Sequence, residues 1–267
     1  MTESRPVRIL LRFASAGVLV FIYLPLVILA IYAFNPSRLQ VWPPTGFTLA
    51  WFGEAAANAA VVRAIVNSLI VGSIATVVAL VLGTLAALAV QRYSFFGRQT
   101  ISFFLVLPIA LPGVVTGIAL RTSFVTFGVD FGLLTIVIGH ATFCVVVVYN
   151  NVIARLRRLP RSPEEASADL GADTLTTFRR ITLPGMRTAL LSGGLLAFAL
   201  SFDEIIVTNF TAGAGTQTIP MWIFTALQRP TELPVVNVVA LIAIAFSVIP
   251  VYFAQRLSDA GATAGRA

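Results

Sequence analysis

One stretch of sequence decides how the whole chain is interpreted: Ser162-Pro163-Glu164-Glu165-Ala166-Ser167-Ala168-Asp169-Leu170-Gly171, followed by Ile181-Thr182-Leu183-Pro184. Ser162 precedes a proline and has Glu165 three residues later, a pattern that predicts a capping box with Pro163 at the first helical position. This helix is expected to end near Gly171, because glycine is the usual residue after a helix C-terminus. The stretch therefore predicts a short helix with a signal at each end.

A second short helix is expected directly after the first. Asp173 or Thr174 would cap it, and Pro184 would stop it after about Thr182. Two interpretations of the 160–184 loop are open. It is a solvated loop that lies on anionic lipid through its arginines, or it is a docking element whose small side chains let a partner approach the backbone. Two capped helices favour the docking element, which would offer the charges of Glu165 and Asp169.

The composition places this loop in a membrane protein. The chain is 58% hydrophobic and only 11% charged, whereas soluble domains carry about 25% charged residues. Apolar runs of about 20 residues match a hydrocarbon core of about 30 Å. The sequence predicts an all-α membrane protein in which 1–267 form a single transmembrane domain. Six spans are expected, at about 13–34, 62–90, 100–122, 132–153, 187–210 and 234–256.

Positive charge gives the orientation of these spans. All 18 basic residues are arginine, and most lie in alternate loops. The exceptions are Arg38, Arg63, Arg121 and Arg229. This asymmetry predicts that both termini and the 160–184 loop are cytoplasmic. It also argues for the membrane surface as the partner of the positive charge, and against nucleic acid. The single cysteine, Cys144, excludes an internal disulfide framework.

Two expected spans carry packing signals. Small residues recur every four positions in the second: Ala75, Ala79, Gly83 and Ala87. They form a smooth ridge that another helix can approach closely. Helix-interrupting residues gather in the third span: Pro108, Pro112, Gly113 and Gly117. Such breaks are tolerated where the backbone is buried in protein or lines a cavity, so this span is either part of a translocation path or an ordinary kinked helix.

Two adjacent carboxylates, Asp203 and Glu204, fall about two-thirds of the way across the fifth expected span. Charges inside a membrane are expensive and tend to face a pathway or pair with a cation. On a helix the two would project about 100° apart, so one could face the pathway while the other meets Arg121 or a neighbouring subunit. The alternative is a structural pair near the outer interface. His140, in the fourth span, is expected to hydrogen-bond to a neighbouring helix.

The loop resembles that of the permease subunits of bacterial ABC importers, which has the form E-A-A, three residues, G, nine residues, I-x-L-P. The chain follows this spacing throughout, and Ser167 is its one departure, a small residue in place of a small residue. The resemblance implies a type I importer permease with six transmembrane helices and a cytoplasmic coupling loop between the fourth and fifth. It also implies that the first loop helix inserts into a groove of a separate ATPase. The coupling residues would be Glu165, Ala166, Ser167, Gly171, Ile181, Leu183 and Pro184.

A finer resemblance is to the spermidine/putrescine permease group. It rests on Gly46–Thr48, on Arg92-Tyr93 and Gly97-Arg98, and on Ser201–Thr208. It implies polyamine transport in the bacterial inner membrane. The implied partners are a related second permease subunit, an ATPase dimer, an extracytoplasmic binding protein and membrane lipid. The candidate substrate path would comprise Asp203, Glu204, Pro108, Pro112 and Gly113.

The chain itself is not expected to be an enzyme. It has no lysine and no Gly-rich phosphate loop, so ATP and Mg²⁺ would be used by the partner ATPase. It shows no metal-ligand spacing and no nucleophile with a base, which predicts that it binds no cofactor or metal and has no catalytic residues. Three alternatives stay open: an importer permease for another small solute, an ion-coupled secondary carrier acting alone, and a membrane sensor scaffold without transport.

Overall fold

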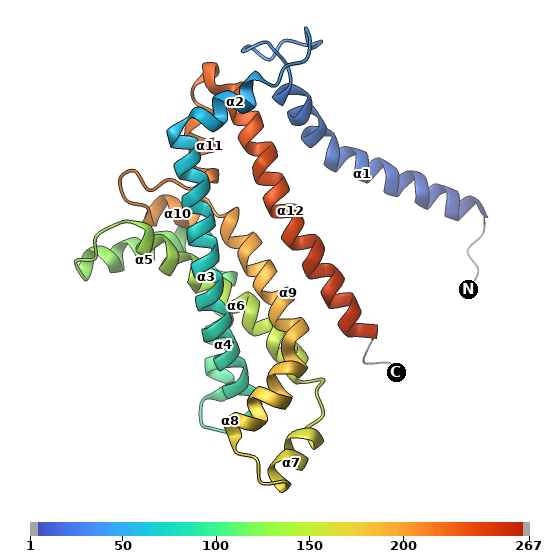
Figure 1. Ribbon diagram of the computed structural model, residues 1–267, viewed down its shortest axis with the longest axis vertical. Coiled ribbons are helices and arrows are strands. Elements are labelled where there is room, and N and C mark those ends of the chain that lie inside the picture. The colour runs from blue at the N-terminus through green and yellow to red at the C-terminus, as the bar shows by residue number, and fades with distance from the viewer. Residues whose placement is uncertain (1–4, 264–267) are drawn as a thin grey trace. The chain divides into compact units, whose positions relative to one another are not determined.

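The computed structural model describes residues 5–263, with side chains up to Arg256, and all regular secondary structure within that range is helical (Figure 1). Five helical runs are long and apolar enough to cross a membrane, or six if one bent pair forms a single span. They include α1 (Arg5–Ala33), α3 (Ala59–Arg92), α6 (Leu133–Leu156), α9 (Leu183–Phe202) and α12 (Leu233–Thr263). The expectation of an all-α membrane protein is confirmed.

The described chain falls into two compact parts. One contains the N-terminal segment up to Val62 together with Ile223–Ala243, and the other contains Arg63–Trp222 and the segment from Ile244 onward. The first part includes α2 (Ala50–Ala57) and the 3₁₀ turn Pro230–Glu232. The second part carries every residue of the two candidate sites described below. The expectation that 1–267 act as one transmembrane domain stays a prediction.

In the first part, tryptophan and arginine side chains brace the segment between α1 and α2. Trp51 Nε1 donates a hydrogen bond to Asn35 O at 2.8 Å. The Arg38 guanidinium lies 4.7 Å from the centroid of the Trp51 ring and donates to Glu54 Oε2 at 3.1 Å. The apolar body of the indole is thus covered while its N–H is satisfied, as buried tryptophan requires.

In the second part, α6 is the most deeply buried helix and packs against α9. The predicted ridge on α3 is confirmed, since Ala75, Ala79 and Ala87 are fully buried. A Cβ added at Gly83 would lie 2.9 Å from Val145 O and 3.0 Å from Tyr149 N. Only glycine permits this approach of α3 to the backbone of α6, because a methyl group would have no space.

The third expected span, 100–122, is interrupted, as its prolines and glycines predict. It consists of α4 (Arg98–Ala110) and α5 (Gly113–Thr126), whose axes are bent by 106°. Leu111 has an extended backbone because the following Pro112 disfavours the helical conformation. Pro108, in contrast, lies inside α4 without ending it. The interruption predicted for this span is therefore confirmed at Pro112 and Gly113 alone.

The fifth expected span, 187–210, is not one continuous helix. α9 ends at Phe202, and α10 (Ile206–Thr211) begins after a short non-helical segment that contains Asp203 and Glu204. Glu204 Oε1 accepts the N–H of Val207 at 2.9 Å and thereby caps the start of α10. A carboxylate that bonds backbone N–H groups competes with a continuous helix, so the chain breaks at this point.

Candidate functional site

The first helix of the 160–184 loop is α7 (Ser162–Asp169), and the predicted capping box is absent from it. The Glu164 and Glu165 N–H groups both donate to Arg161 O, at 2.9 and 3.0 Å. The helix therefore begins one residue earlier than expected, with Ser162 as its first residue and no side-chain cap at its N-terminus. This leaves the Glu165 side chain exposed.

Gly171 ends α7 as the sequence predicts. Its φ is +80°, in the left-handed region that favours glycine. The Gly171 N–H donates to Ala168 O at 2.9 Å, and the Ala172 N–H donates to Ser167 O at 3.1 Å. This pair of bonds is the Schellman motif, which satisfies the last carbonyls of the helix. A Cβ at Gly171 would meet no atom within 4 Å, so the requirement for glycine comes from the backbone alone.

Asp173 caps α8 (Thr174–Thr177), as predicted. Its Oδ1 accepts the N–H of Thr176 at 2.8 Å. Hydrogen bonds from Thr176 to the ionised carboxyl hold the pKa of Asp173 below its ordinary value. The cap is therefore fully formed when the pH is above the ordinary pKa of an aspartate, and it is lost as the pH falls through the lowered one.

The expected stop at Pro184 is wrong. α8 continues through a π-helical turn (Phe178–Thr182) directly into α9, so that Thr174–Phe202 is one helical run. Pro184 is the second residue of α9 and directly follows the π-helical turn, so the helical run passes through this proline without ending. The nearby motif residues Leu183 and Pro184 are exposed and Ile181 is half-buried.

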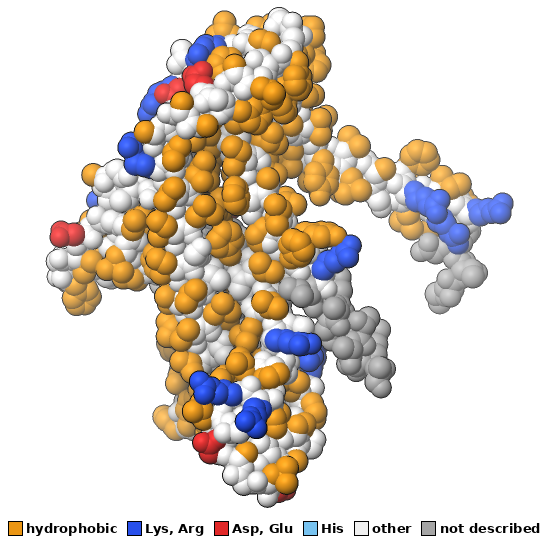
Figure 2. Space-filling view, viewed as in Figure 1, with side chains coloured by type: hydrophobic (Ala, Val, Ile, Leu, Met, Phe, Trp, Pro, Cys, Tyr) orange, Lys and Arg blue, Asp and Glu red, His pale blue; other side chains and the backbone are white. Residues whose placement is uncertain are grey.

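α7 has one face attached to the rest of the chain and one face that is free. Ser167 Oγ hydrogen-bonds Thr177 Oγ1 at 2.9 Å, which joins α7 to α8. Glu165 and Ala166 are exposed, and Leu170 exposes 88% of its surface. Arginine side chains gather at the end of the molecule that carries α7 and α8 (Figure 2). The motif thus divides between an inward Ser167 and an outward surface of small, acidic and apolar side chains.

The second candidate region is the break between α9 and α10. His140 on α6 bridges it, with Nδ1 2.7 Å from Ser201 Oγ and Nε2 2.8 Å from Thr208 Oγ1. The predicted hydrogen bonding of His140 to a neighbouring helix is therefore confirmed. The Thr208 hydroxyl donates its one proton to Glu204 O, so His140 Nε2 must be the donor to Thr208. The imidazole thereby fixes the two helix ends that flank Asp203 and Glu204.

The structure brings part of the expected substrate path together. α5 packs against α10, and a Cβ at Gly113 would lie 3.5 Å from Ile206. Gly113 therefore lies beside the residue that starts α10, close in sequence to Asp203 and Glu204. Arg121, expected as a partner for one carboxylate, instead donates to Phe210 O at 3.3 Å and lies 5.0 Å from the Phe131 ring centroid.

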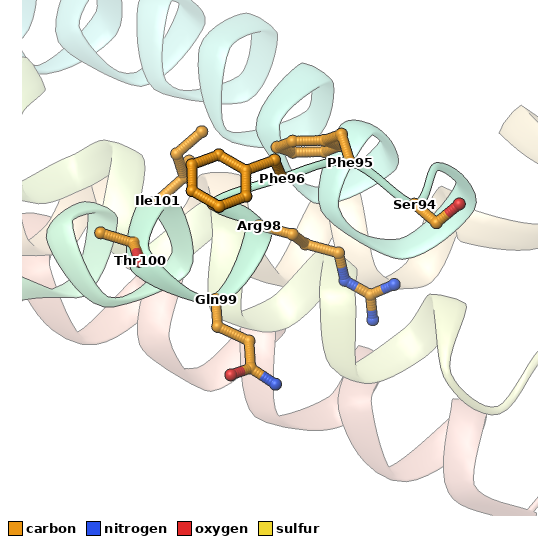
Figure 3. Close-up of a pocket in the computed structure, with 8 residues that line it drawn as sticks. Ser94, Phe95, Phe96, Arg98, Gln99, Thr100 and Ile101 are labelled. Carbon is orange, nitrogen blue, oxygen red and sulfur yellow. The ribbon is translucent and has the colours of Figure 1, made fainter.

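A hollow of about 720 Å³ lies elsewhere, in the loop between α3 and α4 (Figure 3). Ser94–Ile101 line it, and these residues include none of those expected in the substrate path. The Phe96 ring lies beside Ile101, whereas the Arg98 and Gln99 side chains extend away from them (Figure 3). The hollow therefore lies at the loop after α3 and the first turn of α4, beside the exposed Phe96, and no residue of the break between α9 and α10 or of the 160–184 loop lines it.

Long apolar helices, together with one broken pair, define a multi-pass membrane protein. The chain belongs to the family described as binding-protein-dependent transport system inner membrane component, which it matches over residues 79–263. It is 39% identical to the putrescine transport system permease protein PotI of Escherichia coli (strain K12), over 82% of this chain and 80% of that protein. It is 31% identical to the spermidine/putrescine transport system permease protein PotC of Haemophilus influenzae, over 89% and 92% of the two chains.

A solved structure shares the fold. The chain aligns with a bacterial ABC transporter involved in the import of the acidic polysaccharide alginate with a TM-score of 0.71. The alignment covers 96% of this chain and 99% of the other, at 16% identity. The chain is a permease subunit of an ABC importer of the inner membrane. Its relatives are permease components and not enzymes.

Sequence reasoning missed the contacts that hold these regions in place. Ser201 and Thr208 lie 61 and 68 residues from His140, and no local pattern announces the pairing. Glu164 lies one position before the motif, so the motif assigns it no role. Its neighbour Pro163 marked the helix start, but nothing in the spacing showed which side of the helix would face inward.

Proposed function

We propose that this chain is the permease subunit of an importer for polyamines. The observation that carries the proposal is the 39% identity to a putrescine permease over 82% of the chain. The acidic residues at the break between α9 and α10 support it, because a polyamine carries several positive charges and would be stabilised by carboxylates along its path. The alginate transporter supports the fold only, since it shares 16% of its residues with this chain.

Asp203 is the carboxylate that meets the substrate in this proposal. Glu204 already uses one oxygen to cap α10 through Val207 N–H and is half-buried. Asp203 is exposed and ends α9 without a side-chain hydrogen bond among the described residues. Non-helical backbone within a membrane is tolerated where it lines a cavity. The second break, at Pro112 and Gly113, lies beside the first, because Gly113 is next to Ile206 at the start of α10. Pro108, which lies inside α4, would line the same path from the helix that precedes this break.

The outward surface of α7 is the contact through which ATP binding and hydrolysis in the ATPase would act on this chain. The exposed Glu165 and Ala166, together with the Gly171 turn, would fit a groove of an ATPase subunit. Ile181 of the π-helical turn and Leu183 and Pro184 of α9 would support this element. The assembly would contain a second, related permease subunit, two ATPase copies that use ATP and Mg²⁺, and an extracytoplasmic binding protein. Both termini and the 160–184 loop would be cytoplasmic. ATP binding would favour one of two permease states by differential stabilisation.

The test is ATP-dependent uptake of radiolabelled spermidine and putrescine by vesicles that contain the full complex. Saturable uptake that Asp203→Asn reduces at least tenfold, with assembly intact, would support both the substrate and the path. Asp130→Asn is the matched control, because Asp130 is an exposed carboxylate near the end of α5. Stimulated ATP hydrolysis without polyamine uptake would replace the substrate with another small solute. Unchanged uptake by Asp203→Asn would remove the residue from the path.

A further inference from the structure

A single carboxylate oxygen joins α7 to two other helical segments. Arg92 Nη2, at the last residue of α3, donates to Glu164 Oε1 at 2.7 Å. Thr182 Oγ1, at the end of the π-helical turn before α9, donates to the same Oε1, also at 2.7 Å. These partners lie 72 and 18 residues from Glu164 in the sequence. The carboxylate therefore connects the short helix to α3 and to the start of α9.

This connection is partly buried. The side chains of Arg92 and Glu164 expose 14% and 22% of their surfaces, and Thr182 is buried. Charge-assisted hydrogen bonds of this length are the strong ones, and burial protects the ion pair from screening by salt. The two other ion pairs among the described residues, Arg38–Glu54 and Arg229–Glu232, are considerably more exposed.

Glu164 belongs to the inward face of α7. It lies three residues before Ser167, and residues with this spacing share one side of a helix. Ser167 contacts Thr177 of α8, whereas Glu165, Ala166 and Asp169 are exposed. Arg161, just before α7, also donates to Gln91 O, but it does so at 3.3 Å from an exposed side chain. Glu164 is thus the shortest side-chain link from α7 to α3.

We propose that Glu164 is a positioning residue for energy coupling: it transmits displacement of α7 to α3 and α9 without itself binding the ATPase. The inference rests on the proposed function, which places the ATPase on the opposite face of α7. A force applied to the outward face reaches the membrane spans through the carboxylate and its two donors. Without the carboxylate, α7 would keep its outward surface but would be held to α3 only by the longer, exposed bond from Arg161, so the two helices would move less closely together.

The first readout needs neither ATP nor a transported solute. Spin labels at Leu170→Cys and Tyr93→Cys, both exposed positions, report the distance between α7 and the end of α3 in the full chain in nanodiscs. Cys144, the only native cysteine, is replaced by serine in all samples. Glu164→Ala should broaden the distance distribution at least twofold, and Glu164→Arg combined with Arg92→Glu should narrow it again. An unchanged distribution in Glu164→Ala would overturn the proposal.

The second readout is the assembled complex with its ATPase and binding protein. Glu164→Ala should leave ATPase binding within threefold of wild type, while stimulation of ATP hydrolysis by the loaded binding protein falls at least tenfold. The charge exchange with Arg92 should restore most of the stimulation. Glu232→Ala removes a carboxylate from an exposed ion pair of the same 2.7 Å length and should have no effect. Loss of ATPase binding in Glu164→Ala, or failure of the folded exchange variant to recover, would overturn the proposal.

These outcomes separate the proposal from the function on which it rests. Failure of the wild-type complex to bind an ATPase or to import polyamines would reject the proposed function, while the distance measurement would still decide the role of Glu164 in positioning α7. A broadened distribution that leaves coupling intact would reject the role in transmission only.

Discussion

Substitution of Gly171 separates the backbone requirement of the 160–184 loop from the size of the side chain. Gly171 has a φ of +80° and open space around the position of a Cβ, so Gly171→Ala introduces strain without a clash. An alanine held in the left-handed region costs about 1–2 kcal/mol. If the ATPase requires the present end of α7, this strain corresponds to an affinity reduced by roughly 5- to 30-fold. Asparagine adopts this conformation more readily, so Gly171→Asn should retain most of the affinity.

The assay is equilibrium binding of the ATPase subunit to the permease in nanodiscs. Gly128→Ala is a matched control, because Gly128 has a φ of +65° and ends α5 through the same pair of hydrogen bonds. It should lower stability by a similar amount and leave ATPase affinity unchanged. Gly171→Trp adds bulk to the outward surface and should abolish binding. The reasoning is refuted if Gly171→Ala binds as tightly as wild type, or if Gly171→Asn binds as weakly as Gly171→Ala.

Three further predictions follow from the packing and from the loop. Gly83→Ala should lower the free energy of unfolding by about 1–3 kcal/mol through overpacking against Val145 O, whereas Gly17→Ala, at a position with open space, should not. Thermal unfolding in detergent measures both variants. Equal melting temperatures for the two variants would contradict the close approach of α3 to α6. His140→Ala should reduce polyamine uptake more than ATPase binding, because it releases the helix ends beside Asp203. An equal loss of uptake and of ATPase binding would argue for general unfolding. Asp173→Ala should speed tryptic cleavage of the 160–184 loop, whereas Asp173→Asn, which keeps the capping oxygen, should not. With an acid-tolerant protease, the wild-type loop should become as sensitive as that of Asp173→Ala only when the pH falls below the lowered pKa of Asp173. Identical cleavage rates for the two variants would exclude the cap.

Local chemistry made the ends of the short helices predictable. Gly171 and Asp173 act through atoms within a few residues, so the sequence around them contains all the information that their geometry requires. The same holds for Pro112, which breaks the third span by restricting Leu111. The capping box failed because Ser162 and Glu165 also fit a helix that begins one residue earlier. In that register Arg161 O accepts two backbone N–H groups.

Long-range pairing limited the rest. The break between α9 and α10 is bridged by His140, which is separated from Ser201 by 61 residues. The cap that Glu204 gives to Val207 is local, but in an apolar span of ordinary length it does not by itself distinguish a break from a helix that continues. The attachment of Glu164 to Arg92 spans 72 residues. Such contacts depend on how the helices pack, which local periodicity does not specify.

The absence of a stop at Pro184 changes how the two candidate regions relate. Thr174–Phe202 is one helical run of 29 residues, about 44 Å long at 1.5 Å per residue. Glu164 is bonded near its beginning through Thr182, and Asp203 follows its last residue. A displacement of α7 therefore has a continuous helical route to the break that contains the carboxylates. The π-helical turn is the one irregular point along that route, and π-helical turns occur frequently at functional sites. It lies on the α7 side of Pro184, so the part of the run that approaches Asp203 is regular α-helix and would move as a unit.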